Sequence, residues 1–570
     1  MAYKSLEACI QDLEKNGQLI RIKEEVDPYL EMASIQLRAY EKGARAILFE
    51  KVKGSEFRVL SNLFGDIDRS RFLFRDTMEM VQNIALLKKD PLLALKSPLK
   101  YISTPKHLYN ALPKKVSKRS AEFSETTIDK LPQITCWKKD GGPFITLPIV
   151  YTEDVDQPGW TKSNMGMYRI QLGGNDYIQN EEIGLHYQIH RGIGVHQSKA
   201  NAKGEPLKVS IFVGGPPALT FSAVMPLPEG MPELAFAGML GGKRMRYFKE
   251  DGYTVCADAD FVITGEVYPH DVKPEGPFGD HLGYYSLKHD FPVMKVHKVY
   301  HKQNAIWPFT VVGRPPQEDT SFGAMIHELA GDTIQMELPG VKAVHAVDAA
   351  GVHPLLFAIG SERYTPYLKE RYPAEILTQA NHILGFGQMS LAKFLFIAAE
   401  EDNKALNIDD EEAFVQHILE RVNWERDLHF YTKTSIDTLD YSGEGLNTGS
   451  KVVIAAAGEQ CRTLAHTFES KNSFPEGITN VKVVAPGILA VSCTTFETYE
   501  KASTEIKGWA NSLKEYLGEQ ANSLPLLLLC DDADFVAKTY SNFLWSTFTR
   551  ANPSHDIYGI DSFTKHKHWG

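Results

Sequence analysis

Hydrophobic positions in the first part of the chain recur with the spacing of one helix face. The segments "SLEACIQDLEKNG" from Ser5 and "EMASIQLRAYEKG" from Glu31 repeat apolar residues every three or four positions, and each ends in glycine, a residue that commonly closes a helix. The short apolar runs "AILFE" and "FRVLSNLF" come next and predict strands. Residues 1–115 are therefore predicted to form a small N-terminal α/β domain.

Between residues 116 and 325 the pattern changes to many short apolar runs. Segments such as "PFITLPIVYTEDV", "LKVSIFVGG" and "PVMKVHKVYH" are rich in β-branched and aromatic residues and are bounded by Gly, Pro or Asn. One helix, "MPELAFAGMLGG" at 231–242, interrupts them. Short strands separated by turn residues predict a β-barrel or a β-sandwich in this region.

Helical and strand patterns alternate again after this region, which predicts a C-terminal α/β domain over 326–460. An internal repeat extends the pattern. "VKAVHAVDAAG" from Val341 is echoed by "VKVVAPGILAV" from Val481, and "KFLFIAAEED" is echoed by "PLLLLCDDAD", with Pro525 in place of Lys393. The module 461–570 is therefore predicted to be a second, degenerate copy that serves stability or assembly rather than catalysis.

Composition narrows the classes of function. The formal net charge is −11 and the pI is near 6.0, which argues against nucleic acid or an anionic membrane as a partner. The six cysteines include no C-x-x-C pair, so neither a zinc cluster nor a thioredoxin-like site is indicated. The first 22 residues predict a helix and a strand rather than a signal peptide, and apolar runs such as "LPLLLLC" are too short to span a bilayer. We expect a cytoplasmic protein.

The segment "PEGPFGDHLGYY" at 274–285 holds Glu275 and Asp280 on either side of a Gly-Pro-Phe-Gly stretch. One interpretation is a solvated turn. The other is a pair of acids in different environments, in which one stays ionised beside an arginine and the other, desolvated, holds a proton to donate. Arg169 is a candidate for that arginine.

Three separate segments carry residue types that bind metals. Asn164 lies in "SNMGMYRIQL", His190 in "HYQIHRGIGVH", and Glu233 at the start of the predicted helix. An amide, an imidazole and a carboxylate suit Mn²⁺ or Mg²⁺ better than structural zinc. The spacing alone forms no metal motif, however. His186 and His196 fit surface or core histidines equally well, and Glu233 fits a carboxylate that stabilises a helix start.

These segments together resemble a known family. "NMGMYRIQL", "HRGIG", "PELAFAGML", "PEGPFGDHLGYY", "GRPP" and "LAKFLFIAAEED", in this order, resemble the UbiD family of reversible decarboxylases, which use prenylated FMN. The resemblance runs from the N-terminal helix to about residue 450. It implies a multidomain α+β protein with a central split β-barrel, like that of flavin reductases, for the cofactor. It also implies that the C-terminal α/β domain mediates homo-oligomerisation, as a dimer or hexamer.

The resemblance also assigns roles to individual residues. Arg169, Glu275 and Asp280 match the catalytic triad of the family, with Asp280 as proton donor and Glu275 held ionised by Arg169. The positions that match ligands of a divalent ion are Asn164, His190 and Glu233, with His186 as the alternative histidine. Backbone positions that match a potassium site are Ser222, Ala223 and Met225. The positions that match cofactor contacts are Met167, Tyr168, Arg169, Arg191 and Lys393.

The function implied is decarboxylation of an aromatic or α,β-unsaturated acid, with prenylated FMN supplied by a UbiX-type prenyl-FMN synthase. An aspartate at position 280 favours the quinone-biosynthesis branch, whose substrate is 3-polyprenyl-4-hydroxybenzoate. The hydrophobic polyprenyl chain of that substrate implies peripheral membrane contact. A menaquinone-route naphthoate and a phenolic acid remain open as substrates. A flavin oxidoreductase and a non-catalytic assembly protein on the same scaffold are the alternative classes, since a fold does not decide function.

Overall fold

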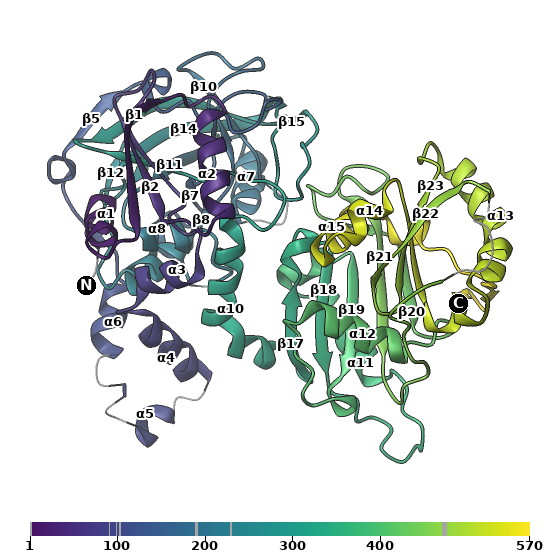
Figure 1. The fold of residues 1–570 in the computed structure, drawn as a ribbon. Coiled ribbons are helices and arrows are strands. Elements are labelled where there is room, and N and C mark those ends of the chain that lie inside the picture. Colours follow the sequence, from purple (N-terminus) through teal and green to yellow (C-terminus); the bar gives the residue numbers. More distant parts are fainter. Residues whose placement is uncertain are drawn as a thin grey trace. The chain divides into compact units, whose positions relative to one another are not determined.

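A computed structural model describes residues 3–89, 92–97, 100–101, 104–187, 192–227, 231–469 and 476–570. The chain forms two compact units, Met1–Gly331 and Asp332–Gly570, which are described separately (Figure 1). In the part of the chain that the structure describes, none of the helices combines the length and the apolar character that crossing a membrane requires.

The first unit begins with a four-stranded sheet. Its strands, in spatial order, are β1 (Leu19–Val26), β2 (Ala46–Val52), β3 (Arg58–Ser61) and β16 (Ile306–Phe309). The predicted helices are present as α1 (Leu6–Lys15) and α2 (Glu31–Glu41), and α1 starts where the Ser5 hydroxyl accepts a hydrogen bond from the Ala8 amide. The strand β16 comes from the end of the β-rich region, yet it pairs in parallel with β3, so the two regions share a sheet.

The central element is a nine-stranded curled sheet, which confirms the predicted split barrel. The spatial order is β6 (Phe144–Ile145), β9 (Ile170–Gln171), β10 (Glu182–Leu185), β15 (His289–Lys302), β14 (Phe261–Glu275), β11 (Leu207–Val213), β7 (Ile149–Glu153) and β8 (Ser163–Gly166), with β5 (Phe123–Thr126) paired to β15. The long strands β14 and β15 form an antiparallel hairpin. Glu275 is the last residue of β14, so the predicted acidic loop is the connection within this hairpin.

Helices and a small sheet complete the first unit. The sheet consists of β13 (Tyr253–Cys256), β12 (Arg246–Glu250) and β4 (Lys114–Lys115). The remaining α-helices of the described residues here are α3 (Ile67–Phe74), α4 (Met78–Lys89), α5 (Leu93–Lys96), α6 (Thr104–Asn110), α7 (Gly192–Lys203), α8 (Pro217–Ser222), α9 (Glu233–Leu240) and α10 (Glu318–Glu337), whose last residues belong to the second unit.

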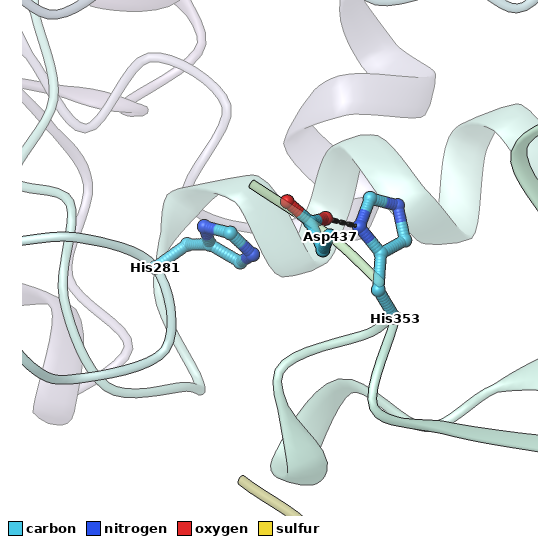
Figure 2. A group of neighbouring side chains, drawn as sticks. All are labelled: His281, His353 and Asp437. Carbon is cyan, nitrogen blue, oxygen red and sulfur yellow. Dashed lines mark hydrogen bonds and ion pairs between the residues drawn. The ribbon is translucent and has the colours of Figure 1, made fainter. Parts of the chain in front are cut away.

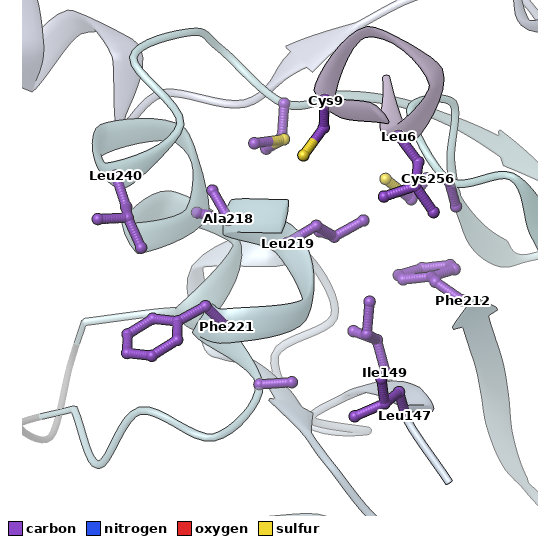
Figure 3. Close-up of a cluster of buried hydrophobic side chains, with 14 of the residues drawn as sticks. Leu6, Cys9, Leu147, Ile149, Phe212, Ala218, Leu219, Phe221, Leu240 and Cys256 are labelled. Atoms are coloured by element: carbon purple, nitrogen blue, oxygen red, sulfur yellow. The ribbon is translucent and has the colours of Figure 1, made fainter. Parts of the chain in front are cut away.

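One hydrophobic core ties the beginning of the chain to the segment that carries several candidate site residues. Leu6 and Cys9 of α1 belong to the same buried cluster as Leu219 of α8, Leu240 of α9 and Phe212 of β11 (Figure 3). Burial of large apolar side chains is the main favourable term in folding. Helices α8 and α9, which flank the candidate metal-binding residues, are therefore anchored on both sides.

The second unit contains two sheets with related arrangements. The first has the order β17 (Val341–Ala346), β18 (Leu355–Gly360), β19 (Phe394–Ala399), β21 (Thr448–Ala456) and β20 (Leu428–Ser435), with helices α11 (Glu375–Leu384) and α12 (Glu411–Arg421). The second has the order β22 (Ile478–Ala485), β23 (Ile488–Cys493) and β24 (Leu526–Cys530), with α13 (Tyr499–Leu517), α14 (Ala533–Ala537), α15 (Tyr540–Arg550) and α16 (Pro553–Asp556). A short hairpin, β25 (Thr564–Lys565) with β26 (His568–Trp569), follows.

In both sheets the first and second strands pair antiparallel, and the second and third strands pair in parallel. In both, a helix precedes the third strand in the chain. The shared arrangement supports the internal repeat. The assignment of 461–570 as a degenerate copy remains a prediction.

A buried carboxyl group at the start of α10 gives a stability prediction for the first unit. Glu318 accepts hydrogen bonds from the Phe64 amide at 2.6 Å and from Gln36 Nε2 at 3.3 Å, and burial raises its pKa to about 7. The folded state therefore binds more protons than the unfolded state between the two pKa values, and stability falls as pH rises through this window. We expect Glu318→Gln to stabilise the protein at pH 8 by up to about 3 kcal/mol, with little effect at pH 5.

Thermal unfolding of both proteins at pH 5 and pH 8 measures this effect. Glu56→Gln, at an exposed position, is the matched control. An equal change in Tm at both pH values for Glu318→Gln would contradict the prediction.

Candidate active site

The structure brings together the arginine and the two acids that the sequence singled out. Arg169 lies directly before β9, and its guanidinium binds the Glu275 carboxylate through two hydrogen bonds of 2.8 Å, from Nε to Oε1 and from Nη2 to Oε2. Its Nη1 also binds Asp280. Bidentate arginine–carboxylate pairs are among the strongest hydrogen-bonded contacts in proteins. One guanidinium therefore fixes both acids.

The interpretation of this loop as a solvated turn is wrong. Glu275 is 0% exposed and Asp280 is 6% exposed. The loop backbone is also held, because the Gly276 amide donates to Gln171 Oε1 at 2.9 Å and the Phe278 amide donates to Ser286 Oγ at 3.1 Å. Buried backbone groups that are paired in this way leave the loop little freedom to move.

Glycine at position 279 is required by close packing. A Cβ atom there would lie 2.0 Å from Cδ1 of Trp137, and the Gly279 amide donates to Asp140 Oδ1 at 2.8 Å. A larger residue would push the loop away from Trp137. The Gly-Pro-Phe-Gly stretch thus holds the two acids at a fixed separation.

His186 is a member of this network that sequence reasoning missed. Its Nδ1 lies 3.1 Å from Glu275 Oε2, and its ring packs on Phe291 with a centroid separation of 3.9 Å. The residue follows β10, whose pairing with β9 puts the His186 amide 3.2 Å from the Arg169 carbonyl oxygen. No spacing rule reveals the pairing of these two strands. The structure thus joins His186 to the Arg169 network, whereas the sequence suggested a core histidine or an alternative metal ligand.

Arg169 sets the protonation state of both acids. Burial alone would raise their pKa values, but Arg169 together with His186 holds the pKa of Glu275 at about 2. Arg169 together with His281 likewise holds the pKa of Asp280 at about 2. Both carboxylates are ionised at neutral pH in this arrangement. The pKa of Asp280 is lowered in the side chains as they stand, because the same guanidinium serves both acids, and the role of Asp280 as proton donor stays a prediction.

Glu233 and Asn164 have environments that fit a divalent cation. Glu233 is the first residue of α9, its Oε2 accepts a hydrogen bond of 3.1 Å from the Met165 amide, and burial raises its pKa to about 7. A Cβ atom at Gly192 would lie 2.2 Å from Asn164 Oδ1, so the amide of Asn164 packs against the start of α7. Half-buried oxygen donors of this kind suit Mn²⁺ or Mg²⁺.

The third candidate ligand of this ion and one candidate cofactor contact lie outside the described residues. His190 and Arg191 are the two residues concerned, and they directly precede Gly192 in the sequence. Tyr168, a candidate cofactor contact, is buried, and its hydroxyl lies 3.4 Å from Asn164 Nδ2.

The candidate potassium positions lie at the end of α8 and just after it, and all three are buried. Ala223 and Met225 belong to the core that contains α8 and α9, and Ser222 is the last residue of α8. The Ala223 carbonyl accepts a hydrogen bond of 3.0 Å from the Met167 amide, which joins this segment to a candidate cofactor contact. The Ser222 hydroxyl donates to the Ala218 carbonyl at 2.6 Å.

Lys393 belongs to the second unit and is buried inside it. Its Nζ lies 2.7 Å from both Asp440 Oδ2 and Ser442 Oγ, and burial lowers its pKa while Asp440 opposes that shift. Elsewhere in this unit the His353 ring is hydrogen-bonded to Asp437 (Figure 2). His281, also drawn in Figure 2, belongs to the first unit, where its Nδ1 lies 3.0 Å from Asp280 Oδ1.

Comparison with known proteins identifies the family of the chain. Three sequence models of one family match in order: the 3-octaprenyl-4-hydroxybenzoate carboxy-lyase N-terminal domain at residues 10–87, the Rift-related domain at 111–315 and the C-terminal domain at 320–456. Together these matches contain all the site residues discussed above.

Relatives from Chlamydia match over nearly the whole length. An uncharacterized protein of Chlamydia trachomatis is 38% identical over 99% of this chain and 93% of its own length. A protein of Chlamydia pneumoniae, named as one of the subunits of a 4-hydroxybenzoate decarboxylase, is 37% identical over 96% of this chain and 89% of its own length.

Solved structures show the same fold. The vanillic acid decarboxylase of Sedimentibacter hydroxybenzoicus, in its closed form, superposes with a TM-score of 0.67 at 23% identity, over 84% of this chain and 97% of that chain. The UbiD-class enzyme HmfF of Pelotomaculum thermopropionicum, in complex with FMN, superposes with a TM-score of 0.61 at 23% identity, over 83% of this chain and 97% of that chain. With three domains matched in order, full-length relatives and a shared fold, the chain belongs to the UbiD family and is a carboxy-lyase of the UbiD type.

Proposed function

We propose that the chain catalyses the reversible, non-oxidative decarboxylation of an aromatic or α,β-unsaturated acid with prenylated FMN. The observation that carries this proposal is the buried network in which Arg169 binds both Glu275 and Asp280. Desolvated acids beside a single guanidinium are typical of a site for proton transfer. When bound, prenylated FMN would supply the electron sink for the carbanion that loss of CO₂ leaves behind.

In this proposal Arg169 also receives the substrate carboxylate. The incoming anion adds a third negative charge beside one guanidinium, and like charges in a buried site raise the pKa of the weakest-held acid. From Arg169 itself Asp280 accepts one hydrogen bond and Glu275 accepts two, while the amide and ring of His281 also contact Asp280. Asp280 therefore takes up a proton from solvent as the substrate binds, while Glu275 stays ionised.

Asp280 then acts as the general acid. As CO₂ leaves, the bonding electrons remain on the substrate carbon, and Asp280 gives its proton to that carbon. The stiff loop keeps Asp280 within reach of the carbon, and the buried surroundings exclude competing water. Asp280 is left ionised again beside Arg169, which restores the starting state.

The cofactor and its ions would be held by the residues that the family resemblance suggested. Asn164, His190 and Glu233 would bind Mn²⁺ or Mg²⁺, and Ser222, Ala223 and Met225 would offer backbone carbonyls to K⁺. Met167, Tyr168, Arg169, Arg191 and Lys393 would contact the cofactor. The half-buried Glu233 carboxylate, with its raised pKa, and the packed Asn164 amide support the divalent site.

Metal binding gives a prediction for Glu233. We expect Glu233→Gln to weaken Mn²⁺ binding about tenfold or more, because a neutral amide replaces the only carboxylate proposed as a ligand. Titration of the protein with Mn²⁺, followed by the electron paramagnetic resonance signal of the free ion, measures this loss. Glu205→Gln, at an exposed position, should bind Mn²⁺ as the unaltered protein does. Equal binding by both variants would remove Glu233 from the metal site.

For the substrate we propose 3-polyprenyl-4-hydroxybenzoate in quinone biosynthesis, with a menaquinone-route naphthoate or a phenolic acid as the alternatives. The similarity to the 4-hydroxybenzoate decarboxylase subunit of Chlamydia pneumoniae and to the vanillic acid decarboxylase supports a hydroxylated benzoate. We further propose a cytoplasmic homo-oligomer that receives its cofactor from a UbiX-type synthase. The proposed domains are 1–115, 116–325, 326–460 and the repeat 461–570.

The test is expression of the chain with and without a prenyl-FMN synthase, followed by visible absorbance and by CO₂ release from hydroxybenzoates, naphthoates and cinnamates. Flavin absorbance and CO₂ release that both require the synthase would support the proposal. If the protein takes up the flavin but releases CO₂ from none of these acids, decarboxylation of this substrate class is excluded.

A further inference from the structure

The imidazole of His186 has one nitrogen that the network does not use. Nδ1 contacts Glu275, but Nε2 is buried and has no hydrogen-bond partner among the described residues. The whole residue is only 6% exposed. A buried polar atom without a partner costs about 1–3 kcal/mol, so a ligand group that forms a hydrogen bond with Nε2 would remove this cost.

Which ring nitrogen of His186 carries the proton defines what kind of group can bind Nε2. Glu275 is ionised and can only accept hydrogen bonds, so Nδ1 of His186 must donate to it. Burial and the nearby Arg169 both lower the pKa of His186, which keeps the ring neutral. Nε2 then carries a lone pair and accepts. The missing partner is therefore a hydrogen-bond donor.

The surroundings favour an aromatic donor. The His186 ring packs on Phe291, and the Arg169 guanidinium lies 4.8 Å from the centroid of the Phe278 ring. Phe291 and Phe278 thus lie against the imidazole of His186 and the guanidinium of Arg169. A phenolic hydroxyl donates one hydrogen bond and sits on a flat apolar ring, which suits a position bordered by aromatic side chains.

We propose that His186 Nε2 accepts a hydrogen bond from a phenolic hydroxyl of the substrate, and so selects hydroxylated aromatic acids over acids without this group. This inference rests on the proposed decarboxylation at the Arg169 network. The donated hydrogen bond also increases electron density on the substrate ring. A site that hydrogen-bonds a hydroxyl rejects the analogue that lacks it, because its own polar atom is then left unpaired.

The test compares three probes, 4-hydroxybenzoate, 4-methoxybenzoate and benzoate, on the protein loaded with cofactor. We expect the unaltered protein to bind 4-hydroxybenzoate at least tenfold more tightly than either analogue, by isothermal titration calorimetry. We expect His186→Phe, which keeps an aromatic ring against Phe291, to lose this preference. His186→Gln, whose amide oxygen can accept the hydrogen bond, should recover part of it.

The matched control is His417 in the second unit. It is also buried, and its Nε2 also lacks a partner among the described residues. His417→Phe should leave the preference for the hydroxyl unchanged. A preference that survives in His186→Phe, or one that is missing from the unaltered protein, would overturn the inference.

Binding and turnover separate this inference from the proposed function. If binding depends on His186 and on the hydroxyl while no acid releases CO₂, the decarboxylation is wrong and the hydroxyl site is right. If the unaltered protein and His186→Phe release CO₂ equally well, and both do so from acids with and without the hydroxyl, the proposed decarboxylation is right and the proposed hydroxyl site is wrong.

Discussion

Replacing Asp280 with asparagine is expected to lower CO₂ release from the cofactor-loaded protein by about 10²–10⁴-fold, the usual contribution of a positioned general acid. Asparagine keeps the size of the side chain and can accept a hydrogen bond from Arg169, but it cannot carry the transferred proton. The loss should therefore appear in kcat rather than in the binding of substrate. CO₂ release under saturating substrate, together with visible absorbance of the bound flavin, measures this effect.

The flavin absorbance of Asp280→Asn should match that of the unaltered protein, which would separate a loss of proton transfer from a loss of cofactor. Asp290→Asn, at an exposed position on β15 of the same hairpin, is the matched control and should retain activity. A decrease of less than tenfold in Asp280→Asn would show that the proton comes from another group.

Replacing Arg169 with methionine is expected to destabilise the first unit by about 3–5 kcal/mol at neutral pH. Removing one partner of a buried ion pair leaves an uncompensated charge, and here the single guanidinium compensates both Glu275 and Asp280. Thermal unfolding at pH 7 measures the loss. Arg119→Met, at an exposed position, should have a far smaller effect.

The pH dependence of stability should also change sign in Arg169→Met. In the unaltered protein the pKa values of Glu275 and Asp280 fall from 4.5 and 3.8 to about 2. The stability that the two ionised acids contribute to the folded state is therefore present above pH 4.5 and is lost as pH falls toward 2. Without Arg169, burial raises both pKa values, so stability should fall as pH rises from 4 to 8. A difference in Tm between the two proteins that is the same at pH 4 and pH 8 would contradict this account.

The binding partner of Glu275 shows how far the residues alone could lead. The sequence indicated Arg169 as a candidate, and the structure places the two side chains in a bidentate pair. The sequence could not indicate His186 as a partner of Glu275. That contact depends on the register of β10 against β9, and a shift of one residue would turn the His186 side chain to the other face of the sheet. The protonation state of Asp280 could not be derived from the sequence for a related reason. It depends on how many carboxylates share one guanidinium, which is a matter of distance in space.

The sequence by itself determined the local features of this protein. Helix starts and ends, the β-rich texture of the middle region, the stiff acidic loop and the family motifs all depend on residues close together in the chain. The tertiary structure decided which distant segments meet. It placed β16 beside β3, His186 beside Glu275 and the Asn164 amide against Gly192. Strand pairing and electrostatic coupling act through space between residues far apart in sequence, so no local pattern encodes them.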